Sequence, residues 1–117
     1  MKYLVLMMID EKKLAALSGT DAKALDDVSL DYAKMLVERG QLLSSYALQS
    51  TQSATSVRVQ SGKVLVTDGP FAESNEQVGG YLLIDAADLN EAIAIASKQP
   101  GAAFGGAEIR PVRDLRE

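Results

Sequence analysis

The chain has 117 residues, and its 12 lysines and arginines against 16 aspartates and glutamates give a formal net charge of −4. It contains no histidine, no cysteine and no tryptophan. This length predicts a single domain with one hydrophobic core. The composition excludes disulfides, thiolate nucleophiles and zinc fingers, and it removes histidine as a general base or metal ligand. Carboxylates, tyrosines, lysines and arginines remain as the groups available for chemistry.

The apolar segments are too short for a membrane protein. The longest run, Tyr3 to Ile9, falls well below the ~20 residues that a transmembrane helix needs. Asp10 and Glu11 follow it too early for a signal peptide. We therefore expect a cytoplasmic protein that contacts no membrane. The acidic balance and the scarcity of aromatic residues predict no nucleic-acid surface either.

Hydrophobic periodicity predicts the elements of the first half of the chain. Residues 2–9 form a strand, and a polar connection with a short helical turn at 11–17 follows. An amphipathic helix is predicted over 21–39, and Gly40 stands where a left-handed residue often ends a helix. Residues 42–48 form a second strand. The stripe of the helix that we expect to be buried consists of Leu25, Val28, Tyr32, Met35 and Leu36.

A hairpin follows, with strands at 55–60 and 63–67 joined by Ser61-Gly62, a typical two-residue turn. This turn defines the register, because each strand residue then has one partner. Valines share one face of the hairpin, and Arg58, Leu65 and Thr67 occupy the other. The predicted pairs are Gln60 with Lys63, Val59 with Val64, Arg58 with Leu65, and Val57 with Val66.

The second half adds a loop at 68–77, a strand at 78–85, a helix from Asp88 to Pro100 and a last strand at 107–112. Asp88 and Glu91 have the spacing of a capping box. The stripe of this helix that we expect to be buried consists of Leu89, Ala92, Ile93 and Ala96. The order β-α-β-β-β-α-β predicts an α+β protein with a ferredoxin-like sandwich, whose central hairpin carries the extra strand.

Two strands are apolar on both faces. In the first, Tyr3 and Val5 alternate with Leu4 and Leu6, and in the later strand Tyr81 and Leu83 alternate with Leu82 and Ile84. Two helices cover only one face of a sheet, so a second subunit, a ligand pocket or both must cover the other. A homodimer that packs sheet against sheet is the simplest solution.

The segment Asp68-Gly69-Pro70-Phe71 has two interpretations. In the structural one, Asp68, Gly69 and Pro70 supply the geometry of a tight turn, and Phe71 attaches the loop to the core. In the functional one, Asp68 lies at a strand end facing a cleft, where it acts as a general base or accepts a ligand hydrogen bond. Glu73 adds a ligand-binding carboxylate. Exposed carboxylates without a metal are the commoner arrangement in such loops, so we predict no metal site.

Other candidate residues lie on the strands. Gly79-Gly80 predicts a bulge or a close approach by another backbone, with subunit packing the favoured cause over a ligand. Tyr3 and Tyr81 fit a pocket lining as well as a core. The cations best placed to hold an anionic ligand are Arg58 and Arg110, although an ion pair between Arg58 and Glu73 or Asp68 fits equally well.

These segments resemble a known family. The blocks 66–73 (VTDGPFAE) and 76–81 (EQVGGY), the start 1–7 (MKYLVLM) and the end 107–112 (AEIRPV) are similar to the YCII-related, or DGPF, family. The resemblance covers nearly the whole chain. It implies a bacterial protein with one domain over 1–117 and no cofactor. It also implies a dimeric α/β barrel, made of ferredoxin-like protomers whose sheets face each other.

The resemblance also implies a range of functions. A related branch includes a lactone-processing dehalogenase that uses a histidine–aspartate pair, and many relatives have a histidine where this chain has Ser29. The loss of that histidine argues against acid–base catalysis of that type here. We expect a homodimer that binds a small anionic molecule in an inter-sheet cleft. The alternative is an interaction module for an extracytoplasmic-function sigma factor, because some relatives are fused to one or encoded beside one.

Overall fold

In a computed structural model that describes residues 1–116, the strands and long helices follow the order β-α-β-β-β-β-α-β, with short helical turns added. Each predicted strand segment is present, and the order has one strand more than the predicted β-α-β-β-β-α-β because the hairpin contributes two strands. Glu117, the last residue of the expected domain, lies outside the described residues. The elements are β1 (Lys2–Asp10), α1 (Glu11–Ala15), α2 (Gly19–Glu38), β2 (Leu42–Ala47), η1 (Thr51–Ser53), β3 (Thr55–Gln60), β4 (Lys63–Asp68), β5 (Glu76–Asp85), α3 (Leu89–Ser97), η2 (Pro100–Phe104) and β6 (Gly105–Pro111).

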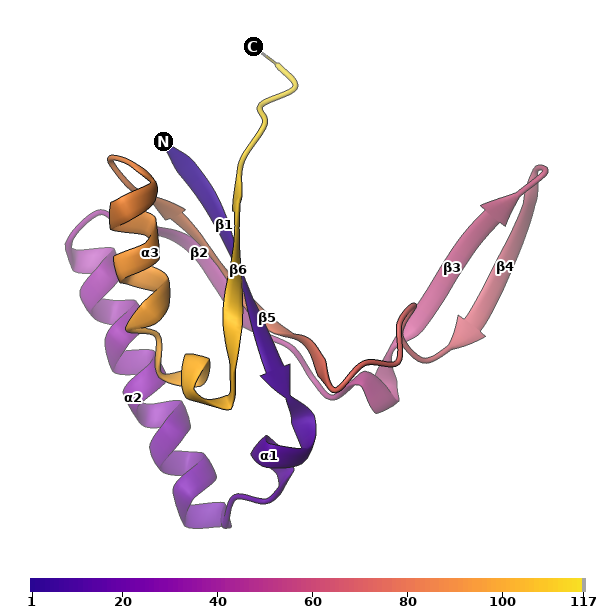
Figure 1. Ribbon diagram of the computed structural model, residues 1–117, viewed down its shortest axis with the longest axis horizontal. Helices are drawn as coiled ribbons and strands as arrows, with labels where there is room; N and C mark the ends of the chain where they lie inside the picture. The colour runs from indigo at the N-terminus through magenta and orange to yellow at the C-terminus, as the bar shows by residue number, and fades with distance from the viewer. Residues whose placement is uncertain (117) are drawn as a thin grey trace.

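Four strands form one antiparallel sheet in the order β2-β5-β1-β6, and β3 and β4 form a separate two-stranded sheet. Helices α2 and α3 lie on one face of the larger sheet, and the hairpin projects away from the helices at the far side of the molecule (Figure 1). The α+β, ferredoxin-like prediction is confirmed. The hairpin of β3 and β4, which we call the arm, is an insertion between β2 and β5.

The core lies between the helices and one face of the sheet. Alternation along β1 buries Tyr3 and Val5 on the helix-covered face, whereas Leu4 and Leu6 are only half-buried on the other, which we call the open face. Burying each such apolar side chain stabilises the fold by roughly 1.5–3 kcal/mol. The core consists of Tyr3, Val5, Met7, Ile9, Leu36, Leu82, Ile84, Ala86, Ala92, Ile95 and Ala96.

Helix α2 begins two residues before its predicted start, because the Ser18 hydroxyl accepts a hydrogen bond from Asp21 N at 3.1 Å and caps the helix. It ends as predicted, with Gly40 at φ 69°. The predicted apolar stripe is only partly correct. Leu36 is buried, but Val28 points outward with 49% of its surface exposed. The helix therefore packs tightly only along its C-terminal half.

Helix α3 starts at the predicted cap, where Asp88 Oδ1 accepts a hydrogen bond from Glu91 N at 2.9 Å. Its predicted buried stripe is wrong in two positions. Leu89 and Ile93 are exposed, and Ile95 is buried beside the correctly predicted Ala92 and Ala96. The helix is therefore rotated about its axis from the predicted orientation. Residues 92, 95 and 96 meet the sheet, whereas the larger side chains at 89 and 93 do not.

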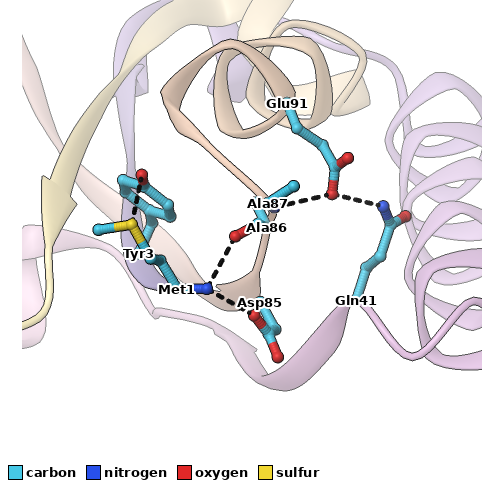
Figure 2. A network of polar contacts seen from close by, with 7 residues as sticks. All are labelled: Met1, Tyr3, Gln41, Asp85, Ala86, Ala87 and Glu91. Carbon is cyan, nitrogen blue, oxygen red and sulfur yellow. Dashed lines mark hydrogen bonds and ion pairs between the residues drawn. The ribbon is translucent and has the colours of Figure 1, made fainter.

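Polar contacts join this cap to the start of the chain and to the α2–β2 connection (Figure 2). Glu91 Oε1 accepts hydrogen bonds from Ala87 N at 3.3 Å and from Gln41 Nε2 at 3.2 Å. The amino group of Met1 donates to Asp85 Oδ1 at 3.0 Å and to the Ala86 carbonyl at 2.9 Å. Together these contacts fix the β5–α3 turn against β1 and α2.

The arm has the predicted register in every pair, from Thr55 with Asp68 to Gln60 with Lys63. Ser61 and Gly62 both have positive φ, 50° and 75°, as a type I′ turn requires. No face of the arm is covered, and Val59, for example, is 69% exposed. The arm extends the chain to a radius of gyration of 15.9 Å, compared with about 13 Å for a compact chain of this length.

The two glycines of β5 stand at an irregularity in the sheet. Gly80 pairs with Met7 and Val78 with Met8, so Gly79 is an extra residue, a bulge. A Cβ on Gly79 would lie 2.6 Å from Ile9 Cγ1, and a Cβ on Gly80 would lie 2.8 Å from the Tyr46 carbonyl oxygen. The close approach predicted at this pair therefore comes from β1 and β2 of the same chain.

We expect Gly80→Ala to lower the free energy of unfolding by about 1–3 kcal/mol, because a backbone oxygen of β2 has no room to move away from the added methyl group. Chemical denaturation measures this change. The matched control is Gly106→Ala, where an added Cβ meets nothing within 4 Å, and where we expect a change within about 0.5 kcal/mol. Equal effects of the two substitutions would contradict the explanation.

Candidate functional site

A cavity of about 650 Å³ lies between α2 and the helix-covered face of the sheet. We call it the α2 cavity. Its volume falls within the range of small-molecule sites. The residues that line it include Leu25, Asp26, Ser29, Ser45, Gln99 and Gly101.

The floor of the α2 cavity is formed where side chains are missing from β5. Gly79 and Gly80 line it, and the close approach of Ile9 and Tyr46 explains why both positions are glycine. Leu82 and Met7 continue the apolar floor toward the core. The bulge therefore creates open space below α2 instead of a packed layer of side chains.

Tyr32 holds α2 at the inner edge of the cavity. Its hydroxyl donates a hydrogen bond to the Ile95 carbonyl of α3 at 2.6 Å. Burial raises the pKa of Tyr32 above the ordinary 10.0, and the positive charge of Arg39 offsets part of that increase. This contact joins the two helices at one point and leaves the N-terminal half of α2 to stand over the cavity.

The structure places the two candidate tyrosines on opposite faces of the sheet. Tyr3 is 3% exposed in the helix-covered core, with its hydroxyl 3.7 Å from Met1 Sδ. Tyr81 directs its side chain to the open face, where its hydroxyl lies 2.9 Å from Ser44 Oγ and its ring centroid 6.2 Å from that of Tyr46. The two side chains therefore cannot line one pocket.

The candidate residues of the DGPF segment gather at the base of the arm. Gly69 has φ 101°, as a left-handed turn residue, and Ser56 Oγ donates to its carbonyl at 2.6 Å. Phe71 is 64% exposed and does not attach the loop to the core, contrary to expectation. The centroid of its ring instead lies 4.5 Å from the guanidinium carbon of Arg58, a cation–π contact that links arm and loop.

The acidic candidates do not converge. Asp68 ends β4 and is exposed, and Glu73 borders a smaller hollow of about 310 Å³ together with Pro70 and Glu11. Within residues 1–116, no three acidic side chains meet in a group that could hold a metal ion. Arg110 lies on edge strand β6, paired with Glu108 at 3.3 Å. One chain therefore does not bring Asp68, Arg58, Glu73, Tyr81 and Arg110 into a single site.

Ser29, where the family resemblance implies a histidine, lies on the wall of the α2 cavity. Sequence reasoning did not find most of the other lining residues, such as Gln99, Ser45 and Phe104. Ser45 and Phe104 stand in no motif, and Gln99 follows α3 as an isolated polar residue. Among the residues singled out from the sequence, Gly79, Gly80 and the predicted ligand-binding Tyr81 also line this cavity.

The fold defines a ferredoxin-like α+β domain with an inserted hairpin. The YCII-related domain matches residues 1–116, and the chain belongs to that family. A curated relative from Rhizobium meliloti (strain 1021), described as an uncharacterised protein, is 38% identical over 115 residues, which is 96% of this chain and 92% of the relative. The family predicted from the DGPF blocks is thus confirmed.

A solved structure shares the fold. It is the 5-chloro-2-hydroxyhydroquinone dehydrochlorinase TftG from Burkholderia phenoliruptrix AC1100, in complex with 2,5-dihydroxybenzoquinone. The alignment covers 99% of this chain and 97% of TftG, with a TM-score of 0.60 and 10% sequence identity. At this identity the likeness concerns the fold alone. Within residues 1–116, no helix is both long and apolar enough to cross a membrane.

We expect Tyr32→Phe to lower the free energy of unfolding by about 1 kcal/mol at neutral pH, through loss of the hydrogen bond to α3. Because the folded state raises the pKa, the stabilisation by the neutral phenol is complete below pH 10.0 and is lost as pH rises through the higher folded pKa. The difference in unfolding free energy between wild type and variant should therefore shrink under strongly alkaline conditions.

Denaturant titrations of wild type and variant at several pH values measure that difference. Groups that the two proteins share titrate in both, so their contributions cancel in the difference. Tyr46→Phe is the matched control, because the Tyr46 side chain is largely exposed and should tolerate the change within about 0.5 kcal/mol. A wild-type minus Tyr32→Phe difference that stays constant between neutral and strongly alkaline pH would contradict the argument.

Proposed function

We propose that this protein binds a small organic molecule in the α2 cavity. The observation that carries the proposal is the cavity itself: about 650 Å³ of space with mainly apolar walls and a few polar groups. A chain of this size gains stability by filling its interior. An open volume beside the core, kept free of side chains by two glycines, is therefore better suited to hold a ligand than to support the fold.

The proposal moves the expected binding site from an inter-sheet cleft to the helix-covered face. Asp68 and Arg58 belong to the arm, which projects away from α2 (Figure 1). Their predicted roles would need a surface that the single chain does not supply. Of the positions singled out by the family pattern, Ser29, Gly79, Gly80 and Tyr81 line the α2 cavity.

The fold of TftG guides the choice of probe compounds. Because that enzyme was solved with 2,5-dihydroxybenzoquinone, the panel should contain small ring compounds of this kind, together with lactones and neutral phenols. A ligand present at ten times its dissociation constant stabilises the folded state by about 1.4 kcal/mol. A rise of several degrees in melting temperature is then expected for a protein of this size.

We expect Ser29→Phe to abolish this thermal stabilisation, because the added ring occupies the cavity below α2. The control is Ala24→Phe, which places the same ring on the exposed surface of the same helix. It should fold and respond to ligand as the wild type does. Absence of any stabilisation of the wild type, or an equal response of both variants, would contradict binding in the α2 cavity.

We further propose that a second copy of the chain covers the open face. Apolar side chains reach this face from both central strands, namely Leu4, Leu6, Met8, Tyr81 and Leu83. The neighbouring edge strand adds a negative and a positive side chain, Glu108 and Arg110, on the same face. In a twofold arrangement each charge can meet its opposite in the other subunit, as a self-complementary interface requires.

We expect Leu6→Lys to convert a dimer into monomers, because it places an unpaired charge in the centre of the apolar open face. Sedimentation velocity over a concentration series measures the change. Val28→Lys is the control, since this exposed valine lies on the outer surface of α2. A wild-type protein that sediments as a monomer at every concentration would refute the dimer.

A further inference from the structure

The lining of the α2 cavity carries a single formal charge, and that charge is negative. Among the described residues that line it there is no lysine and no arginine, and Asp26 of α2 is the one charged side chain. The other polar side chains, such as those of Ser29 and Ser45, are neutral. An anion that enters this site from water finds no cation to replace its hydration. The lining therefore disfavours the anionic ligand expected from Arg58 and Arg110.

Asp26 stands at the mouth of the cavity. It is exposed, and so is Leu30, which lies one turn further along α2 and has 69% of its surface exposed. The inner end of the cavity is formed by the buried apolar side chains of Met7 and Leu82. The cavity therefore combines a hydrated, negatively charged mouth with an apolar interior.

The carboxylate of Asp26 is available to a ligand. Within residues 1–116 it forms no ion pair, whereas the adjacent Asp27 holds Lys23 Nζ at 3.0 Å. Ser29 follows Asp26 by three residues on the same wall, so the two side chains are neighbours on the helix surface. An ammonium group has three hydrogens to donate. A carboxylate and a hydroxyl at this spacing supply two acceptors for such a group.

The charge of the surrounding helix has the same sign. Helix α2 contains five acidic and two basic residues, and the whole chain has a net charge of −4. A negative field of this kind raises the local concentration of cations and lowers that of anions. The field of α2 therefore favours the same class of ligand as the lining does.

We propose that the ligand of the α2 cavity is an organic cation, a primary amine with an apolar body, whose ammonium group binds the carboxylate of Asp26 and the hydroxyl of Ser29. This inference rests on the proposed function and names the ligand class of the same site. The apolar body fills the space between α2 and the Gly79-Gly80 bulge, and the ammonium group stays at the mouth, where water reaches it. Burial of the apolar body supplies most of the affinity. Asp26 supplies the selection for positive charge.

Three probes with the same ring test the inference: phenethylamine, 2-phenylethanol and phenylacetate. At neutral pH the first is a cation, the second is neutral and the third is an anion, so differences in their affinities report on charge. We expect the wild type to bind phenethylamine about 2- to 5-fold more tightly than 2-phenylethanol, the factor that a solvent-exposed ion pair supplies. Phenylacetate should bind more weakly than either. Titrations followed by the backbone amide signals in NMR spectra measure all three affinities.

Variants of α2 separate the contact with Asp26 from the net charge of the protein. Asp26→Asn keeps the size of the side chain and removes its charge, so the preference for phenethylamine over 2-phenylethanol should disappear. Asp31→Asn is the matched control, because it removes the same charge from an exposed position of the same helix outside the cavity lining. It should retain the preference. Asp26→Lys should reverse the order, so that phenylacetate binds more tightly than phenethylamine.

The outcomes distinguish this inference from the proposed function. If none of the three probes binds the wild type, ligand binding in the α2 cavity fails and the inference fails with it. If all three bind with equal affinity and Ser29→Phe blocks them, the cavity remains a binding site and the cationic ligand is refuted. A preference for phenethylamine that Asp31→Asn lowers as much as Asp26→Asn does refutes the contact with Asp26. The amide spectra of the variants verify that they fold.

Discussion

The close packing of three strands around two glycines determines much of this structure. β1 and β2 both approach β5 so closely at Gly79 and Gly80 that any side chain there would overlap Ile9 or the backbone of Tyr46. The sheet gains a bulge at this point, and the space above it holds no side chain from β5. The same two residues therefore keep the sheet continuous and leave a hollow beneath the helix.

The two halves of helix α2 have different roles: one packs in the core and the other borders the cavity. Its C-terminal half is fixed by Leu36 in the core and by the Tyr32 hydroxyl on α3. Its N-terminal half stands over Gly79 and Gly80 and contributes a wall with Leu25 and Ser29. The core and the cavity are thus neighbouring regions of a single layer between helix and sheet. Packing in the first region supports the shape of the second.

Local rules predicted the elements well and the placement of side chains less well. The Ser61-Gly62 turn was sufficient for the register of the arm, because a two-residue turn leaves no freedom in pairing. Alternation within β1 and β5 separated two sets of residues, but it did not show which set meets the helices. Tyr3 and Tyr81 were therefore grouped together, although they lie on opposite faces.

The α2 cavity depends on distances across the fold. Gln99, Ser29 and Ser45 come from three separate elements, and no spacing in the sequence joins them. The rotation of α3, which exposes Ile93 and buries Ile95, similarly follows from the fit of a whole helix to the sheet. Ser29 was singled out from the sequence only as the position of a family histidine, and its place on the cavity wall became visible only in the fold.

The arm is nearly a separate thermodynamic unit. Apart from the turn at Gly69 and the contact between Arg58 and Phe71, its strands bond to each other and pack little against the body. A two-stranded hairpin is only marginally stable in water by itself. Its amide protons should therefore exchange with solvent through local opening long before those of β1 and β5. The changes in unfolding free energy caused by substitutions on the valine face of the arm and by substitutions in the core should accordingly be additive. The arm can therefore change in sequence without altering the stability of the four-stranded sheet.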